Sequence, residues 1–159
     1  MLEFNEIKPG IYIVKYFGRE IVLHTYTCSK VCGDLDSEVQ YRGIKPEYSI
    51  SLIPETALTS PLQIIFATLA YIVYGYELRT RNKGLAYAML VIGEGQITEA
   101  VEFLRRTYRE SGKYYVIEFG GDSGLWNRES CSIDSVITFK ELVDASIIEK
   151  NLETLMRRI

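Results

Sequence analysis

The sequence lacks an apolar run long enough to cross a membrane. A transmembrane helix needs about 20 apolar residues, whereas the nearest candidate, residues 61–76, is shorter and contains Gln63 and Thr68. Residues 1–6 have neither the basic nor the apolar segment of a secretory signal peptide. We therefore expect no membrane partner and a cytoplasmic location.

Cysteine and histidine are scarce, with three cysteines and one histidine in 159 residues. An odd number of cysteines without a secretory signal is typical of a reducing compartment. His24, Cys28 and Cys32 would share one face only on a helix, but the β-branched and aromatic residues around His24 favour a strand. Cys131 is distant, so a fourth zinc ligand is missing. The sequence predicts a half-buried histidine, small apolar thiols, no metal site and no cofactor.

Charge of one sign is also lacking, because 18 Lys and Arg face 21 Asp and Glu, which gives a net charge of −3. Any RNA contact would therefore need a local basic patch. An enzyme built on Cys28, Cys32 or Asp122 would need a base, yet the lone His24 leaves no recognisable nucleophile–base spacing. We predict a non-catalytic protein without catalytic residues.

The sequence does contain enough apolar material for one core. Its length suits a single domain, and no linker or repeat divides it, so residues 1–159 are expected to form one globular unit. Strand patterns occur at residues 11–17 and 21–27, around a turn at Gly18, and again at residues 48–53. The polar segment around residues 33–38 is interpreted as a loop with a short helix. Further strands are expected at residues 113–119 and 136–139.

The middle of the chain is predicted to be helical. Ser60 suits an N-cap, Pro61 suits the first turn, and Gln63 completes a capping box. The helix that follows carries a wide apolar face that includes Phe66. Two more helices are expected at residues 85–92 and 96–108.

The chain ends in further helical patterns, at residues 140–143 and 147–158. Strands are thus followed by helices, one more strand region and terminal helices. This order predicts an α+β fold of two layers, in which an antiparallel or mixed β-sheet packs against a helical layer.

From about residue 50 to the end, the sequence resembles a known family. The matching positions are Ser60, Gln63, Ala67, Ala70, Thr80-Arg81-Asn82, Gly93-Glu94-Gly95-Gln96-Ile97, Glu99-Ala100, Ile148-Glu149-Lys150, Leu152, Leu155 and Ile159. Their order and spacing are similar to those of the small kinase-binding subunit of the KEOPS tRNA-modification complex, the TPRKB family.

The resemblance implies a function in tRNA modification. A member of this family is not an enzyme. It binds the atypical kinase/ATPase subunit of a complex that makes N6-threonylcarbamoyladenosine in tRNA, stimulates that subunit, and helps to capture tRNA by its single-stranded 3′ CCA end. The expected partners are therefore the KEOPS kinase/ATPase subunit and the tRNA 3′ end.

The candidate tRNA-binding residues lie around two breaks between helices. Clustered cations can neutralise backbone phosphates, and glycines at a helix start permit close approach of an anion or a base. A solvated basic loop and an ordinary glycine turn are the competing interpretations. The residues concerned are Arg79, Thr80, Arg81, Lys83, Gly93, Gly95 and Gln96.

Other basic and apolar residues are open to two interpretations. Arg105 and Arg109 share a helix face beside Glu102, which favours an exposed salt-bridged surface over a tRNA contact. The C-terminal apolar residues suit either the groove of a partner kinase or this domain's own sheet. The expected kinase interface consists of Ile148, Leu152, Leu155 and Ile159.

The sequence departs from the family pattern at four positions, Ala86, Ile92, Glu94 and Gly95. Gly95 stands where a basic residue is frequent in the family, and Glu94 stands where Thr or Asn is usual. A protein–protein interaction module of the same fold, without RNA binding, is therefore the alternative hypothesis.

Overall fold

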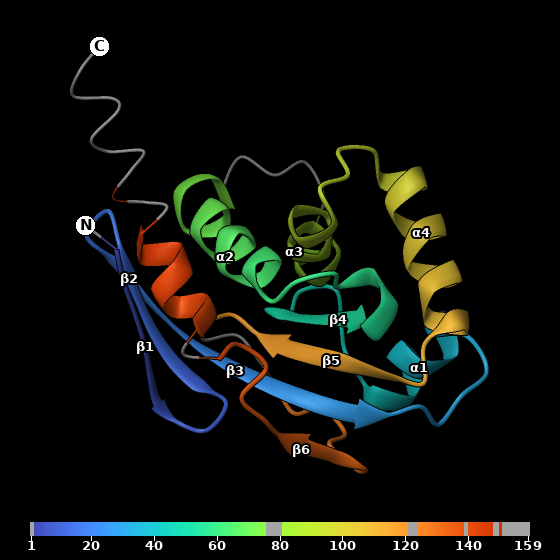
Figure 1. The fold of residues 1–159 in the computed structure, drawn as a ribbon. Coiled ribbons are helices and arrows are strands. Elements are labelled where there is room, and N and C mark those ends of the chain that lie inside the picture. The colour runs from blue at the N-terminus through green and yellow to red at the C-terminus, as the bar shows by residue number, and fades with distance from the viewer. Residues whose placement is uncertain (1, 76–80, 121–123, 139, 148–149, 151–159) are drawn as a thin grey trace.

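The computed structural model describes residues 2–75, 81–120, 124–138, 140–147 and 150. Within these ranges six strands form one antiparallel sheet with helices packed against it, which confirms the α+β prediction (Figure 1). The strands are β1 (Glu3–Lys8), β2 (Ile11–Tyr16), β3 (Arg19–Ser29), β4 (Ile50–Pro54), β5 (Lys113–Glu118) and β6 (Cys131–Ile133). The helices are α1 (Leu35–Arg42), the short 3-10 helix η1 (Glu55–Ala57), α2 (Leu62–Tyr74), α3 (Lys83–Ile92), α4 (Ile97–Glu110) and a helix at residues 140–147.

The long strand β3 is the hub of the sheet, whose order is β1-β2-β3-β5-β4 with β6 paired to β3. The first half of β3 pairs with β2, from Arg19 to His24, and the second half pairs with β6, from Tyr26 to Cys28. Strand β5 pairs with β3 from His24 to Ser29. Strands β2 and β6 therefore follow one another along one side of β3, while β5 occupies the other side.

Two strand assignments from the sequence need correction. Strand β1 was not predicted, although it pairs with β2 along most of its length. The strand expected at residues 136–139 is wrong for residues 136–138, which are not in the sheet, and residue 139 lies outside the described ranges. The backbone of Ile137 bonds to a side chain instead: its carbonyl accepts from the Tyr12 hydroxyl at 2.6 Å, and its N–H donates to that oxygen at 3.1 Å. The nearby strand is β6.

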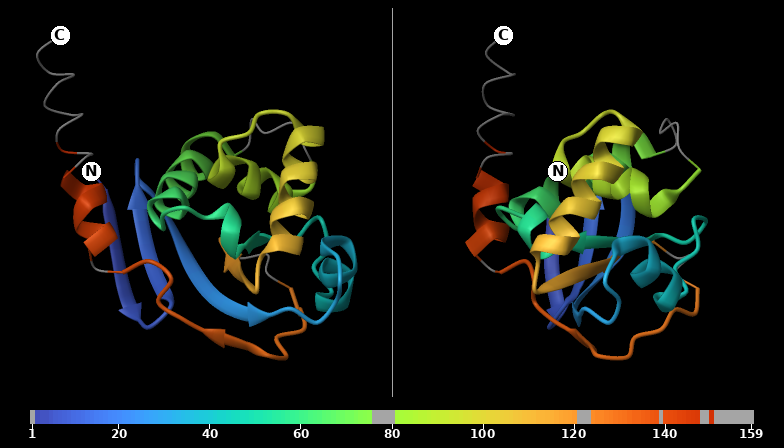
Figure 2. Two further views of the ribbon diagram at one scale, coloured as in Figure 1. Left: turned by 45° about the vertical axis from the view of Figure 1, so that its right-hand side comes forward. Right: turned by 90° about the vertical axis from the view of Figure 1, so that its right-hand side faces the viewer.

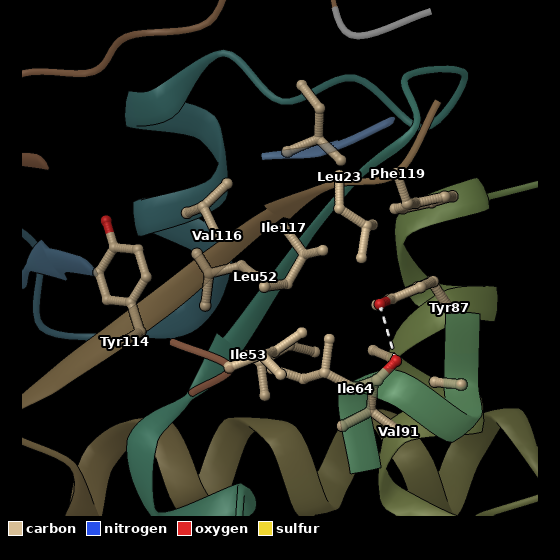
Figure 3. Close-up of a cluster of buried hydrophobic side chains, with 14 of the residues drawn as sticks. Leu23, Leu52, Ile53, Ile64, Tyr87, Val91, Tyr114, Val116, Ile117 and Phe119 are labelled. Atoms are coloured by element: carbon tan, nitrogen blue, oxygen red, sulfur yellow. Dashed lines mark hydrogen bonds between the residues drawn. The ribbon is translucent and has the colours of Figure 1, made fainter. Parts of the chain in front are cut away.

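The core lies between the sheet and helices α2 and α3 (Figure 3). The Tyr87 ring stacks on Phe119 with centroids 4.4 Å apart, and its hydroxyl lies 2.8 Å from Thr68 Oγ1. Helix α2 buries Ile64 but leaves Phe66 43% exposed, so the predicted inward face was wrong at Phe66. The buried face is rotated because α2 packs on both α3 and the sheet.

The predicted start of helix α2 is confirmed only in part, because the N-cap residue is Pro61 and not Ser60. The backbone N–H of Ser60 donates to Gln63 Oε1 at 2.9 Å, and Ser60 Oγ accepts from the N–H of Leu62 at 3.2 Å. The Gln63 side chain thus makes the return bond of the predicted capping box, whereas the Ser60 hydroxyl accepts from Leu62 rather than from Gln63. The helix therefore begins at Leu62, the residue directly after Pro61.

The expectation of free thiols is wrong for two of the three cysteines. Cys28 and Cys131 form a disulfide across a sequence separation of 103 residues. The pairing of β6 with β3 sets these two residues opposite each other, and side chains at opposed positions of antiparallel strands lie on the same side of the sheet. Cys32 stays free, and burial, Glu38 and Asp34 raise the pKa of its thiol.

A buried ionic cluster joins α1 to β5, α4 and the segment before β6. We use this name for Glu38, Arg42, Tyr108 and Tyr114, of which Glu38 and Arg42 are fully buried. Glu38 accepts from the Tyr108 and Tyr114 hydroxyls, both at 2.6 Å, and from two backbone N–H groups. Burial alone would raise the pKa of Glu38, but these hydrogen bonds lower it below the ordinary value.

Arg42 ties the segment at residues 126–130 to the body of the protein. Its guanidinium donates to the carbonyls of Ser29, Asn127 and Glu129, and its Nε donates to the Tyr114 hydroxyl at 2.6 Å. The Asn127 N–H donates back to the Arg42 carbonyl at 2.7 Å. The cluster therefore meets the hydrogen-bonding needs of both buried charges, which is the condition under which such charges are tolerated.

The helix of residues 140–147 lies beside the outermost strand, β1 (Figure 2). Leu142 and Val143 line a hollow of about 480 Å³ together with Leu2 and with residues 3–6 of that strand. An uncovered edge strand can pair with another chain, so the helix shields this edge. None of the described helices has the length and apolar character needed to span a bilayer.

Candidate nucleic-acid-binding pocket

An apolar pocket of about 330 Å³ opens at the edge of the sheet formed by β4. Helix α1, strand β4 and helices α3 and α4, which surround this edge in Figure 1, supply its walls. We call it the β4-edge pocket. Its apolar lining includes Leu35, Val39, Ile50, Leu85, Ala88 and Leu104.

The position of α3 against β4 depends on a glycine. A methyl group on Gly84 would overlap the carbonyl oxygen of Ile50, so only glycine permits this approach. Ser51 Oγ donates to the Gly84 carbonyl at 2.8 Å and fixes the contact. Asn82 caps the helix by accepting from the N–H of Leu85 at 3.0 Å. The start of α3 thus becomes a fixed wall of the β4-edge pocket.

Two segments that carry basic residues meet at this wall. The backbone N–H of Lys83 donates to the carbonyl of Pro46 at 2.9 Å, which joins the start of α3 to the loop after α1. That loop contributes Lys45 to the pocket lining, and Lys45 and Arg81 are both exposed. Lys45 therefore lines the pocket itself, whereas Arg81 and Lys83 flank Asn82, which also lines it.

One carboxylate also lines the β4-edge pocket. Asp36 lies in the first turn of α1, and Arg105 of α4 donates to it from Nη2 at 2.9 Å and from Nε at 3.4 Å. Both side chains are more than half exposed. The sequence pattern predicted that Arg105 shares a face with Glu102, whereas its partner is Asp36 on a different helix.

The predicted tRNA-binding residues separate into two groups. Arg81 and Lys83 lie at the start of α3 next to the pocket, whereas Gly93, Gly95 and Gln96 follow its other end. Helix α3 has 10 residues, which correspond to a rise of about 15 Å. Two of the predicted residues, Arg79 and Thr80, lie outside the described ranges.

The Gly93–Gln96 end of α3 is acidic. Gly93 adopts a left-handed conformation with φ of 72° and ends the helix, and the Glu94 carboxylate accepts from the Gln96 N–H at 3.1 Å. Three carboxylates, from Glu94, Glu99 and Glu102, and one cation, Arg106, line a second hollow of about 310 Å³. A side-chain carboxylate thus already occupies the N–H group that an anion would use, and its neighbours repel phosphate. We therefore centre the candidate site on the β4-edge pocket.

The remaining described residues discussed from the sequence do not line the β4-edge pocket. Tyr87, which follows the basic break in the sequence, is fully buried in the core and is closed to a base. The expected kinase-interface residues, Ile148, Leu152, Leu155 and Ile159, lie outside the described ranges. His24 lies half-buried on β3, as predicted. The described residues contain no group of three or more His, Cys, Asp or Glu that could hold a metal ion.

Sequence reasoning missed Asp36 and Lys45 as site residues. Both belong to a polar segment without a motif, and they reach the pocket only because the loop after α1 contacts the start of α3. The available signal was Gly84, a glycine at the second position of a helix, where only a close approach of another segment explains its presence. Comparison of the chain with known protein families and with curated proteins finds no match.

Proposed function

We propose that this chain is a non-catalytic subunit of a KEOPS-type complex, which holds the 3′ CCA end of tRNA and binds and stimulates the kinase/ATPase subunit. The observation that carries the proposal is the β4-edge pocket, an apolar cavity lined by Lys45 and by Asn82, whose sequence neighbours are Arg81 and Lys83. Cations neutralise backbone phosphates, and apolar walls accept an unstacked base.

The pocket suits a single-stranded end better than a duplex. Its volume of about 330 Å³ lies at the small end of the range for small-molecule sites. Bases in a duplex stay stacked, whereas an unpaired terminal base can leave the stack and enter a cavity. With a net charge of −3, attraction of RNA depends on these local basic residues.

Binding of the kinase/ATPase subunit is supported by the sequence resemblance and by exposed apolar surface. On the helix at residues 140–147, Val143 is 38% exposed and Ile147 is 52% exposed. These residues directly precede the expected interface residues from Ile148 onward. Apolar surface of this kind is a common feature of helix-in-groove recognition.

The RNA part of the proposal is tested by titrating the protein with tRNA and with tRNA that lacks its CCA end, at low and moderate salt. We expect loss of affinity when CCA is removed. The double variant Lys45→Ala/Arg81→Ala should bind intact tRNA more weakly, and its salt slope should fall by about 0.7 for each lost phosphate contact.

A matched control removes two cations elsewhere. Arg106 and Arg109 are exposed on α4, and Arg106 pairs with Glu110 at 4.0 Å. The variant Arg106→Ala/Arg109→Ala lowers the net charge by the same amount and should leave CCA-dependent binding unchanged. Equal binding of both tRNAs, or an equal loss in the two double variants, would contradict a CCA-binding pocket at this place.

The kinase part needs a reconstitution experiment. The purified kinase/ATPase subunit should hydrolyse ATP faster when the chain is added, and Leu152→Asp/Leu155→Asp should abolish the stimulation because charges are costly in an apolar interface. If the ATPase rate is the same with and without the chain, this part of the proposal fails.

The alternative is an interaction module of the same fold that does not bind RNA. The acidic surroundings of the Gly93–Gln96 segment favour it, because Glu94, Glu99 and Glu102 occupy one end of the region that the resemblance assigns to tRNA. Stimulation of the ATPase without any tRNA affinity would identify this alternative.

A further inference from the structure

The β4-edge pocket has two charged residues of opposite sign in its lining, Asp36 and Lys45. Asp36 lies in the first turn of α1, and Lys45 follows the left-handed cap residue Gly43 at the end of that helix. The eight residues of α1 rise by about 12 Å. The carboxylate and the ammonium group are therefore supplied from opposite ends of one helix.

The Asp36 carboxylate is held in place but keeps free capacity. Arg105 donates one hydrogen bond to each carboxylate oxygen, at 2.9 Å to Oδ2 and at 3.4 Å to Oδ1. Among the described residues, no other side chain bonds to this carboxylate. An ionised carboxylate has about four acceptor positions, so about two are available to a ligand in the pocket.

We infer that Asp36 makes the pocket specific for an RNA end with a free ribose 2′,3′-diol. This inference rests on the proposed function. The terminal base enters the apolar part of the pocket, Lys45 neutralises the phosphate that precedes it, and Asp36 accepts hydrogen bonds from the terminal hydroxyls. A carboxylate is a common partner of ribose hydroxyls in nucleotide sites, and the 2′-hydroxyl distinguishes RNA from DNA.

The same carboxylate excludes ends that carry a further negative charge. A 3′-phosphate placed near Asp36 would set like charges side by side, and at separations shorter than the Debye length salt does not fully screen their repulsion. A terminal dideoxyribose would leave the carboxylate without its donors. The pocket should therefore prefer the diol end to both modified ends.

The test uses three single-stranded RNAs that end in CCA and differ only in the last ribose, which carries a free diol, a dideoxyribose or a 3′-phosphate. We expect the native protein to bind the diol end at least about tenfold more tightly than either modified end, a typical effect of hydrogen bonds to a charged group. Asp36→Asn should bind the 3′-phosphate end nearly as well as the diol end. Lys45→Ala should weaken binding of all three by a similar factor.

Two further variants separate the carboxylate from its Arg105 partner. Arg105→Ala leaves the charge of Asp36 uncompensated and should increase the discrimination against the 3′-phosphate. The double variant Asp36→Asn/Arg105→Ala should lack discrimination. If the double variant still discriminates, the effect in Asp36→Asn came from a released arginine, and the role given to Asp36 is wrong.

The remaining outcomes distinguish this inference from the proposed function. Equal binding of the three ends by the native protein, together with a loss in Lys45→Ala, would overturn the inference and leave the RNA-binding function standing. If the native protein binds none of the three RNAs although its circular dichroism spectrum shows that it is folded, both the inference and the RNA-binding function are overturned.

Discussion

Helix α1 presents charges on two faces whose surroundings differ in every respect. Glu38 and Arg42 point into the protein, where both are fully buried and bonded on all sides. Asp36 points to the rim of the β4-edge pocket, where it is exposed and has a single described partner, Arg105. The first pair uses its hydrogen-bonding capacity inside the protein, whereas Asp36 keeps capacity for a ligand. The two faces of α1 therefore differ in unused hydrogen-bonding capacity rather than in the presence of charge.

The largest effect should come from breaking the buried face. Arg42→Ala leaves Glu38 as an uncompensated buried charge and removes the bonds to residues 127 and 129, so we expect a loss of about 3–5 kcal/mol of unfolding free energy. Urea denaturation at pH 7 measures this loss. A loss below about 1 kcal/mol would show that the buried ionic cluster contributes little to stability.

The disulfide should have the next largest effect. Cys131→Ser opens a loop closed across 103 residues, and we expect a loss of about 2–4 kcal/mol. Thermal unfolding with and without a dithiol reductant provides the measurement. Cys32→Ser is the matched control, because Cys32 is free, and it should change stability little. Equal effects of the two substitutions would contradict the assigned pairing.

The pH dependence of stability tests the buried carboxylate directly. The pKa of Glu38 is lowered in the folded protein, so its contribution is present above the ordinary value of 4.5 and is lost as the pH falls through the folded value. Unfolding free energy should therefore decline below about pH 4.5. The variant Glu38→Gln should be less stable at pH 7, and its unfolding free energy should decline less steeply as the pH falls. An unchanged slope would show that Glu38 does not cause the decline.

The smallest effect should come from the exposed face of α1. Arg105→Ala removes an ion pair in which both side chains are more than half exposed, and such pairs contribute about 0–1 kcal/mol. We expect unfolding free energy to change by less than about 1 kcal/mol in the same urea measurement. A loss as large as that of Arg42→Ala would remove the distinction between the two faces.

Features set by neighbouring residues could be predicted from the sequence. Ser60 and Gln63 indicated the start of α2 because a capping box involves residues three positions apart. Gly18 indicated the turn between β2 and β3, and its φ of 71° explains why glycine suits that position. The α+β class followed from the order of such local patterns.

Features set by distant pairings could not be predicted in the same way. Cys28 and Cys131 meet only because β6 pairs with β3, and the three residues of β6 carry no strong strand pattern. Glu38 and Arg42 are four residues apart, a spacing that usually indicates an exposed helical ion pair. Their burial depends on contact with Tyr114 of β5, which no local pattern records.

The candidate site shows the same division between local and distant information. Arg81 and Lys83 were found because they flank a break between helices. Lys45 and Asp36 were missed because only the contact between the loop after α1 and the start of α3 makes them neighbours of that break.

The register that pairs His24 of β3 with Glu118 of β5 also has a consequence during translation. Strand β5 is synthesised roughly ninety residues after that part of β3, on the order of 5–20 seconds later at usual elongation rates. During this interval β2 and β3 can form their hairpin, but the edge of β3 that later pairs with β5 has no partner. Unpaired strand edges promote association between chains. We expect the nascent chain to require chaperone protection until β5 has left the ribosome.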